Sequence, residues 1–234
     1  MIKHSTEQKQ IVDWFNNTYT KRGEWYLRPK HAYYIYLEVL NAKANQKLLD
    51  IACGLGRLLE ASLEYNVVPF GIDISDVAIA KVKAKFPQLD VSVANAEALP
   101  FEDNSFDLLT CIGSLERMID KDKVLNEFLR VGKKECRYCF LVRNSQSTNW
   151  MFFKKFLGLK NKAGHQDAMD YNSWSQLFTM AGFKIANVYP DQYPLMKRLK
   201  RRSFWLKTID YKSVVSIKTP IDKANEFLFI LEKK

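Results

Sequence analysis

Long apolar runs, histidines and paired cysteines are all scarce in this sequence of 234 residues. No apolar run reaches the ~18–20 residues that a helix needs to cross a membrane. The first residues lack the apolar core of a signal peptide, and the four cysteines do not form the framework of a disulfide-rich domain. We therefore expect a soluble protein in a reducing compartment, the cytoplasm.

Metal ligands are scarce as well. Cys136 and Cys139 form a Cys-x-x-Cys pair, but the segment around them is apolar and no second pair completes a zinc site. Among the three histidines, His165 has two acids close by, Asp167 and Asp170, in a short triplet typical of a loop. We expect a buried strand at 136–143 and no bound metal.

Two common nucleotide-binding motifs are also missing. The dinucleotide fingerprint needs a glycine three residues after Gly56, where this sequence has Leu59. No Gly-Lys-Ser/Thr follows the turn, so a phosphate loop is excluded. NAD is therefore disfavoured as a cofactor.

What the sequence does contain is an alternation of strand-like and helix-like segments. Residues 8–41 have a helical pattern interrupted at Gly23 and Pro29, Ser75 and Asn172 suit N-caps, and Gly182 suits a helix end. The expected strands are 47–52, 67–73, 89–94, 106–112, 136–143, 183–189 and 226–232, and the expected helices between them are 57–65, 77–84, 120–131 and 172–181. This alternation predicts an α/β fold with a mostly parallel sheet.

The most informative stretch is 48–56, Leu-Leu-Asp-Ile-Ala-Cys-Gly-Leu-Gly, followed at 71–74 by Gly-Ile-Asp-Ile. In each, an apolar run ends in an acid, first Asp50 and then Asp73. The small residues after the first acid let a backbone approach a ligand closely, and the second acid stands where it could bind a ribose diol. Three further segments follow in order, at 93–101 (Val-Ala-Asn-Ala-Glu-Ala-Leu-Pro-Phe), 104–112 and 125–131.

Together these segments resemble the class I S-adenosylmethionine-dependent methyltransferases that act on small molecules, over about residues 47–143. The resemblance implies a three-layer, doubly wound α/β fold with a seven-stranded, mostly parallel sheet of order 3-2-1-4-5-7-6 and an antiparallel last strand. It also implies one domain over 1–234, with a helical N-terminal cover at 1–45. Insertions at 144–171 and 190–218 would form the acceptor side.

The resemblance also implies which residues hold the cofactor, S-adenosylmethionine. Asp50 would position the methionyl amino group, Asp73 would bind both ribose hydroxyls, and Asn95 would meet the adenine edge as an uncharged substitute for the family's Asp. The methionyl carboxylate needs a donor from the N-terminal cover. Tyr19 and Arg28 are the candidates, unless they only pack on the core. The remaining expected contacts are Ala52, Gly54, Gly56, Ile74, Ala96, Ile112 and Gly113.

Methyl transfer depends mainly on an aligned acceptor, and a hydroxyl acceptor also needs a base. His165, which precedes the expected helix at 172–181, is the first candidate for this base, with capping or loop packing as the alternative. Glu116 is the second candidate. Members of the family often place an acid before a histidine at this point, whereas this chain has Arg117.

Basic charge is concentrated in the last third of the chain. Residues 151–234 hold 16 basic and 7 acidic side chains, and 194–207 alone holds six basic side chains and no acid. Apolar residues are interleaved with them, which fits either a basic amphipathic helix or a solvated face. A basic surface would suit an anionic or lipid-linked acceptor, an anionic membrane or RNA.

We therefore expect methyl transfer from S-adenosylmethionine to a small-molecule acceptor, with a hydroxyl of a sugar, glycolipid precursor or other anionic metabolite favoured. An RNA methyltransferase is the main alternative. It is disfavoured because residues 111–114 read Cys-Ile-Gly-Ser, not the Asn/Asp-Pro-Pro-Tyr/Phe of base-methylating enzymes. A cofactor-binding protein without catalysis is a third possibility, and the oligomeric state is left open.

Overall fold

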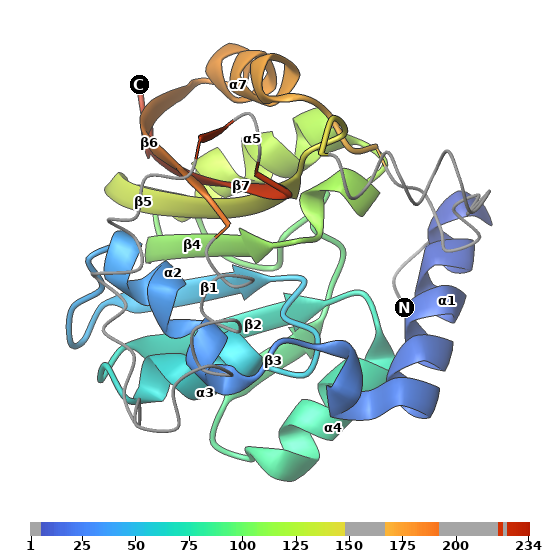
Figure 1. The fold of residues 1–234 in the computed structure, drawn as a ribbon. Helices are drawn as coiled ribbons and strands as arrows, with labels where there is room; N and C mark the ends of the chain where they lie inside the picture. Colours follow the sequence, from blue (N-terminus) through green and yellow to red (C-terminus); the bar gives the residue numbers. More distant parts are fainter. Residues whose placement is uncertain (1–5, 148–166, 192–219, 222–223) are drawn as a thin grey trace, which may run out of the picture.

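The computed structural model describes residues 6–147, 167–191, 220–221 and 224–234. Within these residues a seven-stranded sheet has the order β3-β2-β1-β4-β5-β7-β6, with helices on both faces (Figure 1). The strands are β1 (Lys47–Ile51), β2 (Val68–Asp73), β3 (Asp90–Val93), β4 (Phe106–Ile112), β5 (Gly132–Arg143), β6 (Phe183–Pro190) and β7 (Glu226–Lys233). This order confirms the strand order expected from the sequence.

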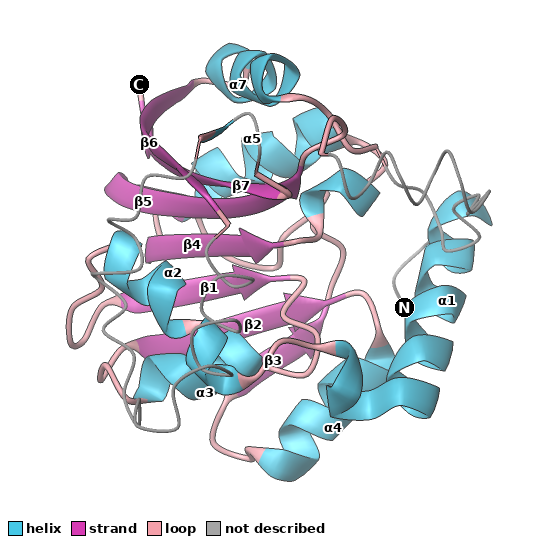
Figure 2. Cartoon of the chain, in the orientation of Figure 1, coloured by secondary structure: helices cyan, strands magenta, loops and turns pink. Residues whose placement is uncertain are grey.

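Among the described residues, five α-helices connect or cover the strands of the parallel part, and one more precedes β6 (Figure 2). They are α1 (Thr6–Arg22), α2 (Tyr34–Val39), α3 (Arg57–Leu63), α4 (Asp76–Lys85), α5 (Lys121–Val131) and α7 (Tyr171–Met180), with α5 between β4 and β5. Short 3-10 turns occupy Gly23–Tyr26, Lys30–Ala32 and Leu115–Arg117 (η1, η2 and η3). Gly23 and Pro29 thus interrupt the N-terminal helices where the sequence predicts.

β7 explains the mixed direction of the sheet. It pairs antiparallel with β5 on one side and β6 on the other, whereas β1 to β5 pair in parallel. Its residues 227–231 are all buried, because the strand lies inside the sheet and has a helical layer on each face. A continuous apolar run is the sequence pattern of such a strand.

Two apolar layers hold the helices onto the sheet. On one face, Phe128 of α5 and Phe178 of α7 each pack against Phe140 of β5, with both ring-centroid distances 4.9 Å. On the other face, Leu37 of α2 and Leu58 of α3 belong to a separate buried cluster that also includes side chains of α4. The three-layer arrangement follows from these two faces.

Local chemistry sets most element boundaries, with two differences from the sequence-based expectation. Ser75 caps α4 by accepting a hydrogen bond from the N–H of Ala78 at 3.0 Å. α7, however, is capped by Asp170 and not by Asn172, since the Asp170 carboxylate accepts from the N–H of Ser173 at 2.8 Å. Gly182, with φ +104°, follows the end of α7 as expected.

The second difference is the start of β5, which begins at Gly132 and not at 136. The pairing of β4 with β5 shifts register between Phe106 and Leu108, which admits extra residues of β5 at the start of the ladder. The predicted burial of Cys136 and Cys139 in this strand is confirmed, because they are 1% and 0% exposed. Burial raises the pKa of both thiols.

Helix α1 stands beyond the carboxyl ends of the parallel strands, toward which the arrowheads of β1, β2 and β4 point (Figure 1). Its Asn16 donates to Asp76 of α4 at 2.8 Å, and Lys81 of α4 donates to the backbone oxygen of Tyr19 at 2.7 Å. α1 therefore covers the edge of the sheet where ligands bind in open α/β folds. Among the described residues, no helix is long and apolar enough to cross a membrane.

Candidate functional site

The turn after β1 has a backbone shape that few residues tolerate. Ala52, Gly54 and Gly56 have φ values of +60°, +54° and +72°. A Cβ on Gly54 would lie 2.8 Å from the hydroxyl oxygen of Tyr19, so the glycine allows α1 to approach the turn. Ala52 is a non-glycine residue in the left-handed region, which costs ~1–2 kcal/mol.

Asp73, at the end of β2, joins this turn to the neighbouring strand. Its carboxylate accepts from the N–H of Gly54 at 2.8 Å and from the N–H of Ser75 at 2.9 Å. The side chain is nearly buried, and this burial raises its pKa to about 6 despite the two hydrogen bonds. A carboxylate held by backbone donors is fixed in direction and can accept further bonds from a diol.

Asp50, at the end of β1, is the second buried acid of the site. Its carboxylate accepts from the hydroxyl of Thr110 in β4 at 2.7 Å. Burial raises its pKa to about 7, with the nearby charge of Asp73 acting in the same direction. Two buried acids at adjacent strand ends favour a ligand that carries a cation or several hydrogen-bond donors.

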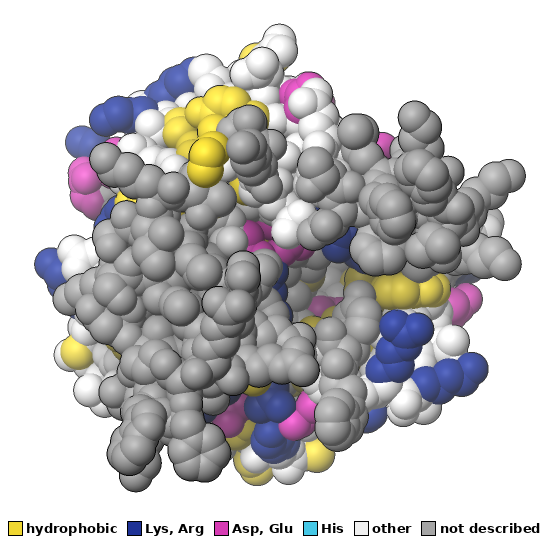
Figure 3. Space-filling model, in the orientation of Figure 1, with side chains coloured by type: hydrophobic (Ala, Val, Ile, Leu, Met, Phe, Trp, Pro, Cys, Tyr) yellow, Lys and Arg dark blue, Asp and Glu magenta, His cyan; other side chains and the backbone are white. Residues whose placement is uncertain are grey.

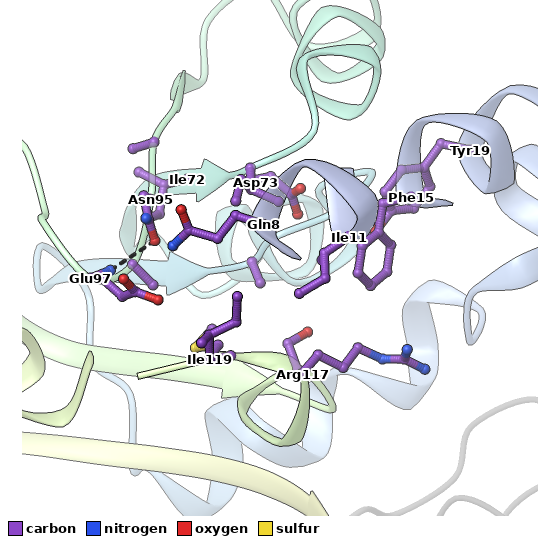
Figure 4. A pocket seen from close by; sticks show the side chains of 16 residues that line it. Gln8, Ile11, Phe15, Tyr19, Ile72, Asp73, Asn95, Glu97, Arg117 and Ile119 are labelled. Carbon is purple, nitrogen blue, oxygen red and sulfur yellow. Dashed lines mark hydrogen bonds between the residues drawn. The ribbon is translucent and has the colours of Figure 1, made fainter. Parts of the chain in front are cut away.

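A pocket of about 610 Å³ opens between these strand ends and α1. Figure 4 shows Ile11 and Gln8 of α1 facing Asp73, Asn95 and Glu97 across it. Its other lining residues are Phe15, Tyr19, Ala52, Ile72, Ile74, Ala94, Ala96, Ser114, Arg117, Met118 and Ile119. Mostly apolar walls with a few fixed polar groups are the usual character of a small-molecule site.

A second pocket, of about 480 Å³, continues past the glycine turn. It is lined by Asp50, Ala52, Cys53, Gly54, Ile112, Gly113 and Ser114 from the sheet side, and by Phe15, Tyr19, Leu27, Tyr33 and Arg117 from the other side. Phe15, Tyr19, Ala52, Ser114 and Arg117 line both pockets, so the two form one elongated site. Acidic, basic and hydrophobic side chains are all visible in the hollow on this face (Figure 3).

The structure brings most of the sequence-predicted cofactor residues to this elongated site. Tyr19, Asp50, Ala52, Gly54, Asp73, Ile74, Asn95, Ala96, Ile112 and Gly113 all line one or both pockets. Gly56 lies one step away, where it forms the N-cap of α3.

Arg28 was a candidate donor to the methionyl carboxylate, but its guanidinium binds other groups in the structure. Its guanidinium donates to the Asp191 carboxylate at 2.7 and 2.9 Å, and it also donates to Glu226 and to the hydroxyl of Tyr36. It lines neither pocket. Tyr19, which lines both, is therefore the better placed of the two N-terminal candidates.

Glu116 lies in η3, directly after β4, and its side chain is fully buried. Neither carboxyl oxygen has a hydrogen-bond partner among the described residues, and the Nε of Arg143 lies 4.0 Å from one of them. Burial raises the pKa of Glu116. Glu226, 4.0 Å from the same Arg143 Nε, has a pKa raised to about 7 by burial. Glu116 is thus next to the site but does not line either pocket.

Among the pocket residues that were not predicted as site residues, Arg117 and Gln8 have long polar side chains. Arg117 places its guanidinium 5.1 Å from the ring centroid of Trp14 and 5.5 Å from that of Phe15, which ties η3 to α1. Gln8 is buried in the first turn of α1. Its position three residues before Ile11 was the available signal, because both then share the covered face of the helix.

Several predictions fall outside the described residues. They are the base candidate His165, the basic segment 194–207 and most of the two insertions at 144–171 and 190–218. Asp167 and Asp170, which follow the histidine in sequence, are described. Asp167 pairs with Lys121 at 3.2 Å, and Asp170 caps α7. No cluster of metal-ligating side chains occurs within the described part of the chain.

Comparison with known proteins agrees with this geometry. Residues 49–140 match the family model described as a methyltransferase domain. A ubiquinone/menaquinone biosynthesis C-methyltransferase of Campylobacter jejuni is 34% identical over 103 residues, which cover 41% of this chain and 44% of that protein. The corresponding protein of Idiomarina loihiensis is 26% identical over 203 residues, 82% of this chain and 78% of its own length.

A solved structure extends the likeness to the whole fold. Geranyl diphosphate C-methyltransferase from Streptomyces coelicolor A3(2) superposes with a TM-score of 0.69, at 12% identity and with 100% of each chain covered. That structure holds S-adenosyl-L-homocysteine. The strand order, the glycine turn and the family match over residues 49–140 together agree with a class I, Rossmann-like S-adenosylmethionine-dependent methyltransferase domain. The match to the Campylobacter protein spans less than half of that relative's length.

Proposed function

We propose that this chain transfers the methyl group of S-adenosylmethionine to a small-molecule acceptor. The observation that carries the proposal is the position of two buried acids, Asp50 and Asp73, next to the glycine turn. Asp73 is held by the N–H groups of Gly54 and Ser75, and Asp50 by the hydroxyl of Thr110. The acids stand at the ends of adjacent strands, along an elongated site with apolar walls.

The polar groups of the site suit the cofactor. Asp73 offers a fixed carboxylate to the ribose hydroxyls, and Asp50 offers a buried negative charge to the methionyl ammonium. Gly54, where a Cβ would meet the hydroxyl of Tyr19 at 2.8 Å, lets Tyr19 reach the turn. Tyr19 would donate to the methionyl carboxylate. When bound, the cofactor supplies an electrophilic methyl group on a sulfonium.

The contribution of the chain to the rate would be mainly alignment. Ile112 at the end of β4 and Gly113 after it line the second pocket, and α1 lines it through Phe15 and Tyr19. Walls that exclude water and fix an acceptor in line with the methyl group provide most of the rate in such a displacement. The acceptor side is proposed to be completed by 144–171 and 190–218.

A hydroxyl acceptor loses its proton during methyl transfer, so the site needs a base that takes it up. His165 is the first candidate on sequence grounds. Glu116 is the second, because its buried carboxyl oxygens lack hydrogen-bond partners among the described residues and a raised pKa suits a group that takes up a proton near neutral pH.

We favour a hydroxyl oxygen as the acceptor atom and keep carbon as the second candidate. The names of the relatives, which are C-methyltransferases, favour carbon. Either atom must lose a proton during the reaction, so both are compatible with a base at His165 or Glu116. The six basic residues of 194–207 support an anionic or lipid-linked acceptor, and a peripheral contact with anionic membranes.

A transfer assay with methyl-labelled cofactor tests the proposal. The protein is incubated with pools of phenols, sugars, lipid-phosphate-linked sugars, quinone precursors and structured RNA, and the labelled product is identified by mass spectrometry. Label in a small molecule supports the proposal, and the bond that carries it separates oxygen from carbon. Label in RNA alone would overturn it, and tight cofactor binding without transfer to any pool would favour the non-catalytic alternative.

A further inference from the structure

The first turn of α1 places a neutral amide in the pocket that receives the adenosine half of the cofactor. Gln8 is 8% exposed, while its neighbours Glu7, Lys9 and Gln10 are exposed. Its side chain extends from the helix toward Asn95 and Glu97 on the opposite wall (Figure 4). Because Gln8 lines the pocket and carries both a donor and an acceptor, its amide is suited to recognise a polar group of a ligand.

The opposite wall provides only part of what an adenine requires. The side-chain oxygen of Asn95 already accepts from the N–H of Glu97 at 3.0 Å. This hydrogen bond stabilises the loop after β3. An adenine presents one exocyclic amine as donor and ring nitrogens as acceptors. The exocyclic amine has two N–H groups, so beside the remaining lone pair of Asn95 it can use a second acceptor, and Gln8 carries one.

A glutamine amide matches adenine in a well-known way. Its oxygen accepts from the exocyclic N6 amine while its nitrogen donates to N7, so that both hydrogen bonds lie in one plane. Asp73, Ile74 and Ala96 line the same pocket on the side where a ribose and the adenine face would lie. Gln8 reaches in from α1, so the N6–N7 edge would face it.

We propose that Gln8 determines the specificity of the site for adenine by binding the N6 amine and N7 of the cofactor through its side-chain amide. The inference rests on the proposed function and adds a residue of the N-terminal helix to the cofactor site. It also makes cofactor binding anchor α1, because the helix itself carries the contact.

Calorimetry with two ligands tests this assignment. S-adenosylhomocysteine and its 7-deaza analogue, in which N7 is replaced by C–H, are titrated into the full chain and into two variants. Gln8→Ala removes the amide, and Gln10→Ala removes the same side chain from an exposed position of the same helix. The wild type and Gln10→Ala should bind the parent ligand roughly 5- to 100-fold more tightly than the analogue. In Gln8→Ala this ratio should fall close to one.

The ratio is internal to each protein, so a general loss of stability cannot imitate the result. A second variant, Gln8→Glu, keeps the shape and the acceptor but loses the donor, and should bind the 7-deaza analogue at least as well as the parent. Retention of the wild-type ratio in both Gln8 variants would overturn the assignment. A wild type that binds neither ligand would instead overturn the proposed function.

Discussion

Arg28 in the N-terminal cover and Asp191 at the end of β6 form a two-pronged ion pair, with N–O distances of 2.7 and 2.9 Å. The residues are 163 positions apart in sequence. The same guanidinium binds Glu226 at the start of β7 and the hydroxyl of Tyr36 in α2. One side chain therefore joins the cover to the last two strands of the sheet, next to the site.

Removing this guanidinium should destabilise the fold. In Arg28→Ala, Asp191 and Glu226 would remain close together in a largely buried place without their cation, and the free energy of unfolding should fall by about 3 kcal/mol. Urea denaturation at pH 8 measures this change. The matched control is Lys123→Ala, which breaks an exposed pair with Asp120 and should leave stability unchanged. Equal stability of Arg28→Ala and the wild type would contradict the network described here.

The acids of the site should make the free protein less stable as pH rises. Burial raises the pKa of Asp50 and Glu226 to about 7 and that of Asp73 to about 6, above the values expected for the unfolded chain. Between pH 4 and 8 the folded state therefore binds more protons than the unfolded state, so stability is highest at the acidic end and is lost toward neutrality.

Asp50→Asn isolates one of these contributions. The variant should gain stability on the order of a few kcal/mol at pH 8, where the wild-type carboxylate is ionised, and the gain should vanish near pH 4. Denaturation curves at both pH values provide the comparison. An exposed control, Asp90→Asn in β3, should show no such pH-dependent gain. A loss of stability in Asp50→Asn at pH 8 would contradict the assigned direction.

The left-handed backbone of Ala52 should be a source of strain. With φ +60°, its Cβ opposes the conformation, and Ala52→Gly should raise the free energy of unfolding by up to about 1 kcal/mol once the greater freedom of glycine in the unfolded chain is counted. Ala61→Gly, in the buried middle of α3, should lower it instead. If both substitutions destabilise equally, the strain is not at Ala52.

Acceptor methylation should depend on a base near η3 or before α7. Once an acceptor is identified, His165→Ala should lower turnover by about 10²–10⁴-fold with little change in cofactor affinity. Glu116→Gln, which is isosteric and removes only the titratable group, is the parallel variant. The dependence of turnover on pH distinguishes the two candidates. Loss of the true base should remove the fall in turnover that the wild type shows at acidic pH. Full activity in both variants would leave proximity as the main source of rate.

The sequence was sufficient for most of the elements because they carry their own local signals, and the strand order followed from the family resemblance. Ser75 caps a helix in the predicted way, and the apolar run at β7 predicts a buried strand. Boundaries that depend on contacts between distant elements were not predictable. β5 starts early because of a register shift against β4, and Asp170 competes successfully with Asn172 for the cap of α7.

The site residues likewise divide into those with a local sequence signal and those that depend on contacts between distant elements. Asp50 and Asp73 could be predicted because they end apolar runs and parallel strands bring their carboxyl ends to one edge, and Asn95 because residues 93–101 resemble a segment of the family. The partners of Arg28 could not be predicted, because Asp191 and Glu226 lie 163 and 198 residues away in a region without a motif. Gln8 was missed for a similar reason, as only the docking of α1 over the strand ends reveals what it faces.

Titration of S-adenosylhomocysteine into the wild-type protein, followed by calorimetry at pH 8, tests the central claim most directly. We expect saturable binding of one ligand per chain. Asp73→Asn, which keeps an acceptor for the Gly54 N–H but removes the charge, should weaken it by roughly 10- to 100-fold, as the loss of a charge-assisted hydrogen bond predicts. Absence of binding to the folded wild type at millimolar ligand would contradict the account.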